Sequence, residues 1–220
     1  TLNAAIDLYA TVEIISRKDK RIVLHSQDLN LEDSFSSLNT LPDNHPLELI
    51  TRTLKFYAPK GGLEISTSCQ APLGSGIGGS SALNIALHGA LNKFTGKKYS
   101  KQEMIEIARN IETQVIRVPA GSQDYFPAMY GGVRSINPGF LGIDTETLSI
   151  KPKELTRHMI LCYSGKPRNS GINNWEVTKK ALDGDKKVVR HLSTIRDCAV
   201  EMHQLLIKGR ISGIASVFNK

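Results

Sequence analysis

The sequence predicts an α+β protein, because strand-like alternation and helical spacing of apolar residues follow one another along the chain, separated by polar or glycine-rich turns. Residues 4–15 and 63–69 alternate between apolar and polar side chains, whereas residues 82–94 carry apolar side chains at helical spacing. Of the 220 residues, 40% are hydrophobic and 22% are charged. This composition is typical of a folded globular protein and excludes a disordered or fibrous one.

The N-terminal part is expected to form antiparallel sheet followed by a helix. Residues 4–15 are predicted as a strand, with residues 21–24 as its hairpin partner across a polar turn. Residues 29–45 are rich in Ser, Asn, Asp and Pro and are predicted as a loop. Residues 47–57 carry apolar side chains at helical spacing, and the glycine pair 61–62 is expected to end that helix.

The middle of the chain predicts a strand and then two helices. Residues 63–69 form the strand, which leads into a glycine-rich stretch, and the helix over residues 82–94 is expected to stop at Gly96. Ser100 and Glu103 have the spacing of a capping box that opens the next helix.

The C-terminal part predicts further strands and two long helices. Strands are expected at residues 131–136 and 147–150, and the apolar run at residues 158–163 is expected to be buried sheet. Helices are expected at residues 172–182 and 186–208.

Charge and cysteine content narrow the classes of function. The net charge of +7 would suit an anionic partner, but the densest basic group, residues 179–190, is interleaved with aspartates, which favours a solvated face over an RNA-binding patch. The three cysteines lie far apart, which argues against a zinc site or a disulfide framework. No apolar run reaches the length of a membrane span and the N-terminus has no signal-peptide layout, so a cytoplasmic protein is expected.

The most informative stretch is residues 71–82, APLGSGIGGSSA. Its four glycines let backbone N–H groups approach an anion closely, and the stretch leads into a helix whose N-terminal dipole end also favours negative charge. Ser80 and Ser81 lie at the transition, so one hydroxyl can cap the helix while the other points at a phosphate or its magnesium ion. The stretch matches neither the Walker-type P-loop nor the dinucleotide fingerprint. The alternative is a glycine-rich connector with an ordinary serine cap.

Residues 72–82 resemble the Pro-x-x-x-Gly-Leu-Gly-Ser-Ser-Ala signature of the GHMP kinase family, which includes galactokinase and the homoserine, mevalonate and phosphomevalonate kinases. Ile77 stands for the usual Leu, and Gly79 stands where Ser or Thr is common. Downstream, Glu112 is followed by Pro-Ala-Gly-Ser-Gln-Asp at residues 119–124, which is similar to the Glu and Gly-x-x-Asp pair of the sugar-kinase branch.

The resemblance implies a kinase that uses ATP and Mg²⁺. Ser80 and Glu112 would position the magnesium ion, and Asp124 would orient or deprotonate the acceptor hydroxyl. Gln123 and Arg168 are candidate substrate contacts, Arg168 for an anionic group such as a sugar phosphate. The residues that would bind ATP and its phosphates are Pro72, Gly74, Ser75, Gly76, Ile77, Gly78, Gly79, Ser80 and Ser81.

Each of these assignments has a plainer alternative. Glu112 could be a solvated carboxylate near a helix end, and Asp124 could serve only to accept backbone N–H groups of its turn. Gln123 could merely support that turn, and Arg168 could be an ordinary surface charge.

The resemblance also implies a two-domain fold. Residues 1–152 would form the nucleotide-binding domain, similar to domain 2 of ribosomal protein S5, and residues 153–220 would begin a ferredoxin-like C-terminal domain. The pattern alone places a boundary near residues 138–142 or 151–153. The family's first substrate-binding segment and its late glycine-rich segment would lie beyond the two ends, so we expect a fold that is incomplete at both ends.

The later Gln-Asp-Tyr and Tyr-Ser-Gly-Lys segments are most similar to heptose-phosphate and related sugar kinases. This implies transfer of the γ-phosphate of ATP to a hydroxyl of a sugar or sugar phosphate, either D-glycero-D-manno-heptose phosphate kinase-like or galactokinase-like. The alternatives are a mevalonate-type kinase, a catalytically silent nucleotide-binding protein and, least favoured, a basic nucleic-acid-binding protein. We expect a small-molecule substrate, no nucleic-acid or membrane partner, and a homodimer as one option for assembly.

Overall fold

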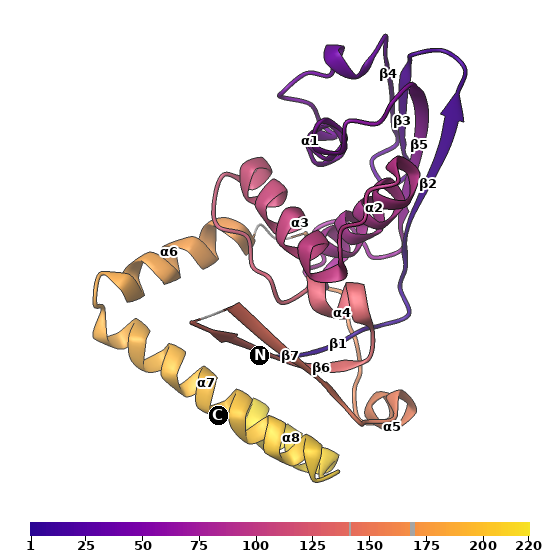
Figure 1. Ribbon diagram of the computed structural model, residues 1–220. Coiled ribbons are helices and arrows are strands. Elements are labelled where there is room, and N and C mark those ends of the chain that lie inside the picture. The colour runs from indigo at the N-terminus through magenta and orange to yellow at the C-terminus, as the bar shows by residue number, and fades with distance from the viewer. Residues whose placement is uncertain (141, 168–169) are drawn as a thin grey trace.

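The computed structural model describes residues 1–140, 142–167 and 170–220 and has the predicted α+β composition (Figure 1). Two antiparallel or mixed sheets are built from its strands, with helices between and beneath them. The strands are β1 (Leu2–Ala4), β2 (Ala10–Arg17), β3 (Ile22–Ser26), β4 (Leu31–Phe35), β5 (Gly62–Cys69), β6 (Val133–Gly139) and β7 (Gly142–Leu148). The helices are α1 (Glu48–Tyr57), α2 (Gly79–Thr95), α3 (Lys101–Ile116), α4 (Tyr125–Tyr130), α5 (Pro152–Thr156), α6 (Ser170–Leu182), α7 (Lys186–Ile207) and α8 (Ile214–Phe218).

The four-stranded sheet has the order β2-β5-β3-β4, and helices α1 and α2 cover its inner face (Figure 1). Strand β5 runs antiparallel to β2 and parallel to β3. Alternate residues of each strand point inward, so that Leu24 of β3 and Ile65 of β5 are fully buried against Leu54 of α1 and Leu87 of α2. Burial of this face fixes β5, and therefore the start of the glycine-rich loop that follows it.

The predicted hairpin between the first two long strands is wrong. Strand β5 lies between β2 and β3, so the connection from β2 to β3 passes over the start of β5. A Cβ on Gly62 would collide with the carbonyl oxygen of Asp19 and would lie 2.7 Å from that of Arg21. Gly62 therefore admits this crossing, and helix α1 ends earlier, at Tyr57 with Ala58 in the left-handed conformation.

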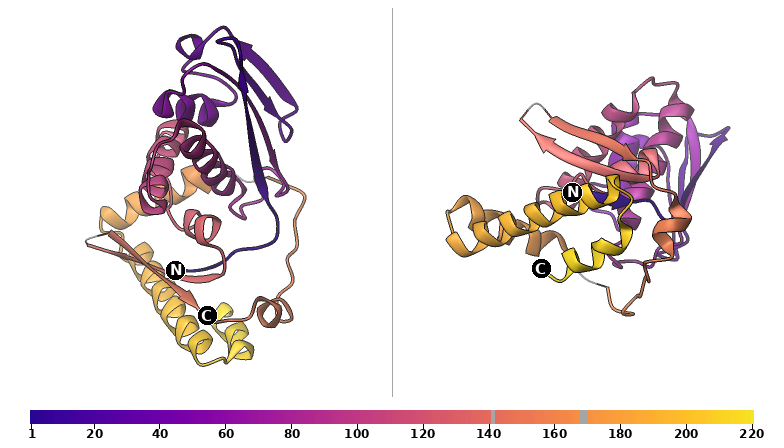
Figure 2. Two further views of the ribbon diagram at one scale, coloured as in Figure 1. Left: turned by 45° about the vertical axis from the view of Figure 1, so that its right-hand side comes forward. Right: turned by 90° about the horizontal axis from the view of Figure 1, so that it is seen from below.

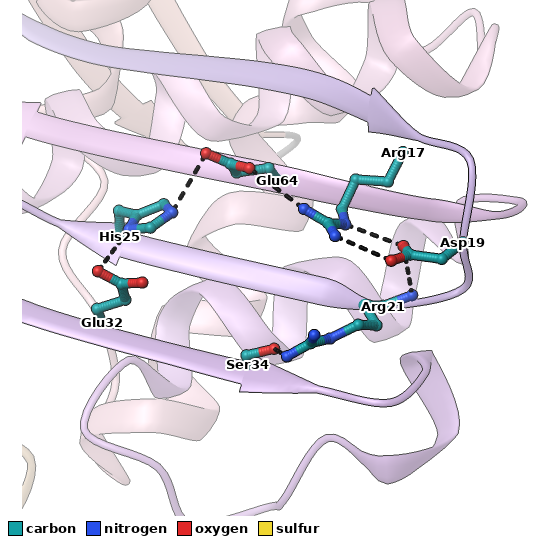
Figure 3. Close-up of polar contacts among 7 residues, drawn as sticks. All are labelled: Arg17, Asp19, Arg21, His25, Glu32, Ser34 and Glu64. Atoms are coloured by element: carbon teal, nitrogen blue, oxygen red, sulfur yellow. Dashed lines mark hydrogen bonds and ion pairs between the residues drawn. The ribbon is translucent and has the colours of Figure 1, made fainter.

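The outer face of the four-stranded sheet carries paired charges, as Figure 3 shows. The Arg17 guanidinium contacts Asp19 at 2.9 Å and Glu64 at 3.5 Å. The His25 ring lies between the carboxylates of Glu32, at 3.3 Å, and Glu64, at 3.2 Å. Because its basic groups lie beside acidic ones, this face is a solvated surface of paired charges and not a basic patch for an anionic partner.

The three-stranded sheet has the order β1-β6-β7 and is covered on both faces (Figure 2). Ile136 of β6 packs with residues of α2, α3 and α4, among them Ile105 and Phe126. Val133 of β6 packs in a separate cluster with Leu206 of α7. Helices α2, α3 and α4 therefore lie between the two sheets, and α7 closes the other side.

Four helical predictions agree with the structure. Helix α1 lies within one residue of the predicted start, α2 stops at Gly96 with φ of +69°, and α7 spans almost the whole predicted range. Helix α3 begins with the predicted capping box, in which the Ser100 hydroxyl accepts from the N–H of Glu103 and the Glu103 carboxylate accepts from the N–H of Ser100.

Three strand and loop predictions need correction. The predicted strand at residues 4–15 is two strands, β1 and β2, which belong to different sheets. The predicted loop at residues 29–45 contains β4, because β3 offers it a free edge. Residues 158–163 were expected to be buried sheet, but no strand forms there, and Ile160 is 91% exposed. None of the strands in the described part of the chain pairs with this run, and an apolar run becomes buried sheet only where a partner strand is present.

Candidate active site

The glycine-rich loop between β5 and α2 is built from left-handed turns. Gly74, Gly76 and Gly78 have φ of +69°, +76° and +81°, a region that is costly for residues with a Cβ. The N–H of Ser75 donates to the carbonyl of Pro72 at 3.0 Å, which closes the first turn. The alternation of glycines in the sequence thus corresponds to repeated reversals of the backbone, as a cradle for an anion requires.

Helix α2 begins three residues earlier than predicted, at Gly79, and the expected serine cap is not formed. Its N-cap is Gly78, and no side chain caps it. Gly79 permits this early start, because a Cβ there would lie 3.1 Å from the Cβ of Ala71. The first N–H groups of the helix are therefore left without a side-chain cap and remain available to a negatively charged ligand.

The Ser80 hydroxyl points to the next helix instead of capping its own. It donates a hydrogen bond of 3.2 Å to Oε1 of Glu112, which lies on α3 and is half-buried. A serine hydroxyl and a carboxylate, both hard oxygen donors, meet at the mouth of the loop. Glu112 thus does not have the free carboxylate that the solvated-helix-end alternative would give it.

A buried tyrosine donates a hydrogen bond to the other carboxylate oxygen of Glu112. The hydroxyl of Tyr125, which is fully buried at the start of α4, donates to Oε2 of Glu112. Nδ2 of Asn84, on α2, donates to the Tyr125 hydroxyl at 3.3 Å and to the carbonyl of Ala108 at 3.1 Å. Burial and the neighbouring Glu112 charge raise the pKa of Tyr125, so its hydroxyl stays protonated.

Asp124 lies directly against the loop. A Cβ on Gly78 would come within 3.3 Å of the Cβ of Asp124. Nδ2 of Asn3, in β1, donates to Oδ1 of Asp124 at 3.3 Å and to the carbonyl of Gln123 at 3.1 Å. The Asp124 carboxylate makes no capping bond to α4. Burial raises the pKa of Asp124, and the hydrogen bond from Asn3 partly opposes that rise.

A cavity of about 490 Å³ opens beside Asp124 and the loop. One wall is the segment that connects β1 to β2, including Asp7 and Tyr9, and the opposite wall is formed by α2 and α4. Ile77 and Gly78 form the border with the loop. Among the residues described as lining it, only Asp7 and Asp124 carry a charge. The cavity thus offers two carboxylates and apolar walls to a ligand that reaches the loop.

One of the two candidate substrate contacts, Gln123, is not brought into this arrangement. The Gln123 side chain is exposed and is not among the residues lining the cavity, although its carbonyl accepts from Asn3. Arg168 lies outside the described residues. The sequence reasoning also missed Asn3, Asn84 and Tyr125. A signal existed for Asn84, because an Asn within an otherwise apolar helix face indicates a buried polar group with a dedicated partner.

The residues fit the ligands that the sequence implied. The glycine cradle and the uncapped start of α2 suit the phosphates of ATP. Ser80 and Glu112 suit Mg²⁺, which takes few protein oxygens and completes its shell with water and phosphate. Within the described ranges, no group of three or more His, Cys, Asp or Glu side chains could hold a metal ion, so the site lacks the larger ligand set of an all-protein metal centre.

Residues 44–132 match the family model of the GHMP kinase N-terminal domain, and this range contains the loop, Glu112 and Asp124. The stretch that builds the loop and its two carboxylates is a GHMP kinase N-terminal domain. This confirms the resemblance seen in the sequence and supports the expectation of a small-molecule kinase. The matched range contains β5 and helices α1 to α4, which carry the loop, Glu112 and the start of the turn at Asp124.

Two similar sequences and one similar structure illustrate the relationship. The D-glycero-α-D-manno-heptose 7-phosphate kinase of Campylobacter jejuni is 26% identical over 100% of the chain and 67% of the relative. The galactokinase of Thermococcus kodakarensis is 26% identical over 95% of the chain and 60% of the relative. The crystal structure of a D-glycero-D-manno-heptose 1-phosphate kinase from Bacteroides thetaiotaomicron superposes with a TM-score of 0.75 over 98% of the chain and 67% of that structure, at 22% identity.

The chain thus spans about two thirds or less of the length of these proteins. The structural likeness establishes the fold. Among the described residues, no helix combines the length and the apolar character needed to cross a bilayer.

Proposed function

We propose that this chain carries the nucleotide site and the proton-accepting carboxylate of an ATP-dependent kinase that phosphorylates a hydroxyl of a sugar or sugar phosphate. The observation that carries the proposal is the position of two carboxylates around one glycine cradle. Glu112 is hydrogen-bonded to Ser80 at the start of α2, and Asp124 lies against Gly78 on the cavity side. Phosphoryl transfer needs placement and charge neutralisation more than covalent chemistry, and this arrangement supplies both.

In this proposal the loop and the start of α2 hold the phosphates. Backbone N–H groups of Gly76, Gly78, Gly79 and Ser80 face the triphosphate, and the side chains of Ser80 and Glu112 bind the magnesium ion. When bound, the magnesium ion neutralises charge on the phosphates. Pro72, Gly74, Ser75, Ile77 and Ser81 shape the same loop.

Asp124 acts on the acceptor. The acceptor hydroxyl oxygen forms a bond to the γ-phosphorus, the bond from that phosphorus to the β–γ bridging oxygen breaks, and ADP leaves. Asp124 accepts the hydroxyl proton, and the rise of its pKa by burial makes it a better base than an exposed aspartate. Its hydrogen bond from Asn3 holds the carboxylate at the cavity border.

The cavity supports a hydroxyl-rich acceptor. Carboxylates accept hydrogen bonds from sugar hydroxyls, and Asp7 faces the same cavity as Asp124. The heptose phosphate kinase and galactokinase relatives favour a sugar or sugar phosphate over mevalonate as the substrate. We assign Gln123 and Arg168 to the substrate only as candidates, since Gln123 is not among the residues that line the cavity and Arg168 lies outside the described residues.

The domain division follows the same proposal. Residues 1–152 form the nucleotide-binding domain with the fold of domain 2 of ribosomal protein S5, and residues 153–220 begin the ferredoxin-like domain. The kinase works in the cytoplasm on a small molecule, with a homodimer as one option for its assembly.

Transfer of the γ-phosphate of ATP to a panel of sugars, sugar phosphates and mevalonate tests the proposal. We expect product with a sugar or sugar phosphate, and we expect Asp124→Asn to lower kcat by about 10²–10⁴-fold while ATP binding persists. Asp144→Asn, which changes an exposed carboxylate on β7, is the matched control and should leave kcat unchanged. Full turnover by Asp124→Asn would remove Asp124 from the mechanism.

The same measurements separate the catalytically silent alternative. A silent nucleotide-binding protein would be stabilised against heat by ATP and would yield no product on any acceptor. If mevalonate were the only acceptor to give product, the chain would belong to a mevalonate-type kinase and the proposed sugar acceptor would be wrong.

A further inference from the structure

Tyr125 has contacts that core packing alone does not explain. Its ring is fully buried with Phe126 and Ile136, as a phenylalanine ring would be. Its hydroxyl, however, reaches out of that cluster to the carboxylate of Glu112. A buried hydroxyl costs free energy unless it finds a partner, so this polar group needs a reason beyond filling the core.

We propose that Tyr125 is a positioning residue, which fixes the Glu112 carboxylate so that Oε1 is presented beside Ser80 for the cation. This inference rests on the proposed function, because it concerns the same magnesium ligand. It adds a residue, a direction of hydrogen bonding and a measurable consequence for metal affinity.

The hydrogen bonds of Glu112 support this role. Oε2 accepts from the Tyr125 hydroxyl and Oε1 accepts from the Ser80 hydroxyl at 3.2 Å. A glutamate side chain has three rotatable bonds, and ordering it at the moment of metal binding would cost conformational entropy. Because the Tyr125 hydroxyl is bonded to Oε2, the side chain of Glu112 is already ordered before the ion arrives, and Oε1 points towards Ser80.

The direction of the Tyr125 hydrogen bond is itself fixed. The Asn84 amide donates to the hydroxyl oxygen at 3.3 Å, so the hydroxyl proton is directed to its acceptor, Glu112. The amide is in turn held by the carbonyl of Ala108 at 3.1 Å. This chain of bonds joins α2, α3 and α4, and partners of this kind orient metal ligands in known sites.

The position of Tyr125 in the sequence links the two carboxylates. Tyr125 directly follows Asp124 in the chain. The same stretch of backbone therefore places Asp124 at the cavity and places the Tyr125 hydroxyl on Glu112. A shift of α4 would move both groups together. The residue therefore couples the metal side of the site to the acceptor side.

Metal binding without turnover tests the inference. Mn²⁺ is titrated by calorimetry into the protein with a non-hydrolysable ATP analogue, for the parent protein, Tyr125→Phe, Glu112→Gln and Tyr130→Phe. We expect Tyr125→Phe to weaken the Mn²⁺ affinity by about 10–100-fold, the usual effect of losing an orienting partner. Tyr130, five residues later on the same helix, packs its ring against Phe126 and under the Lys101 ammonium, and it serves as the matched control.

The outcomes separate this inference from the proposed function. If Glu112→Gln leaves the Mn²⁺ affinity unchanged, the proposed metal role of Glu112 fails. If Glu112→Gln weakens binding but Tyr125→Phe binds as the parent does, the positioning role of Tyr125 is overturned. Affinity of the analogue without metal should be the same in Tyr125→Phe and the parent, and a loss there would show a general collapse of the site instead.

A second variant covers the case in which Tyr125→Phe does not fold. Asn84→Leu keeps the shape of the side chain and leaves the Tyr125 hydroxyl in place, but removes the donor that directs it. We expect weaker Mn²⁺ binding in Asn84→Leu as well, by a smaller factor than in Tyr125→Phe. Unchanged Mn²⁺ affinity in a folded Asn84→Leu would then overturn the inference.

Discussion

Gly78 and Asp124 lie so close that a single methyl group on the glycine would touch the carboxylate. The Cβ of such a residue would be 3.3 Å from Cβ and 3.4 Å from Cγ of Asp124. Gly78 is at the same time the N-cap of α2, with φ of +81°. The phosphate-facing loop and the acceptor-side carboxylate therefore meet at one residue, and their separation depends on the absence of a side chain there.

The first prediction concerns Gly78→Ala. The left-handed backbone costs about 1–2 kcal/mol for a residue with a Cβ, and the new methyl group pushes Asp124 away from the loop. We expect a lower Tm and, in addition, a kcat at least about tenfold lower, because small displacements of catalytic groups have large effects. Thermal unfolding and the phosphotransfer assay measure the two effects separately.

Gly89→Ala is the matched control for this variant. Gly89 lies in the exposed middle of the same helix, and a Cβ there meets no atom within 4 Å. Alanine should stabilise the helix by about 0.5–1 kcal/mol and leave kcat unchanged. If Gly78→Ala behaved like Gly89→Ala, the close contact with Asp124 would have no role in catalysis.

The second prediction concerns the crossing at the start of β5. Gly62→Ala places a methyl group against the backbone carbonyls of Asp19 and Arg21, which cannot move without breaking the bond from the N–H of Leu63 to the carbonyl of Arg21. We expect a loss of more than about 3 kcal/mol in the free energy of unfolding. Gly61→Ala, at φ of +85° with open space around its Cβ, should cost only about 1–2 kcal/mol. Equal losses in urea unfolding of the two variants would contradict the crossing.

The crossing also shows why part of the fold was not predictable. The strands predicted at residues 4–15 and 21–24 overlap β2 and β3, and the polar turn between them suggests a hairpin. Which strand lies beside which is decided by burial of both against α1 and α2, and β5 is inserted from far along the sequence. Local periodicity carries no information on such long-range pairing.

In the candidate site, too, the features set by local sequence were predictable and those set by long-range packing were not. The glycine spacing of the loop and the short motifs around Glu112 and Asp124 were visible in the sequence, because each depends on local backbone or residue type. Asn3 lies 121 positions before Asp124, and nothing in its local pattern connects the two. Tyr125 adjoins Asp124 in sequence, but an aromatic residue by itself indicates no polar contact, and the contact of its hydroxyl with Glu112 needed the packing of α3 on α4.

The third prediction is a pH-dependent gain in stability for Asp124→Asn. Burial raises the pKa of Asp124 in the folded state, so between its ordinary value and that raised value the folded state binds more protons than the unfolded state. Stability from this group therefore falls as the pH rises through that window. Asn removes the buried charge, and we expect its Tm to exceed that of the parent by about 1–4 °C at pH 7.5.

The pH dependence is what identifies the cause of that gain. The difference in Tm should shrink as the pH is lowered through the acid range, where the parent carboxyl takes up its proton. Asp144→Asn, at an exposed position, should show no such pH-dependent difference. A constant gain at every pH would point to packing or to another charge, and would contradict burial of the Asp124 carboxylate as its origin.

The last prediction concerns His88, which lies in α2 with 0% of its surface exposed. Its Nδ1 contacts the Tyr57 hydroxyl at 3.1 Å, and Nε2 has no hydrogen-bond partner among the described residues. Burial lowers the pKa of His88 to about 4. Between that value and the unfolded value of about 6.5, the unfolded state binds the extra proton, so stability is lost as the pH falls through this window.

Acid titration of stability tests this reading of His88. The lowering of the His88 pKa from 6.5 to about 4 corresponds to about 3 kcal/mol of stability, which is lost between pH 6.5 and pH 4, and His88→Leu should flatten the profile over that range. His191→Gln, which removes an exposed histidine on α7, is the control and should retain the parent's slope. Because the buried His88 ring packs against Tyr57 of α1, its protonation should loosen α2, the helix that carries Ser80 and follows the phosphate cradle. ATP-analogue binding should therefore weaken in parallel with stability below pH 6.5 in the parent and remain unchanged in His88→Leu, and a parent slope identical to that of His88→Leu would contradict the buried neutral imidazole.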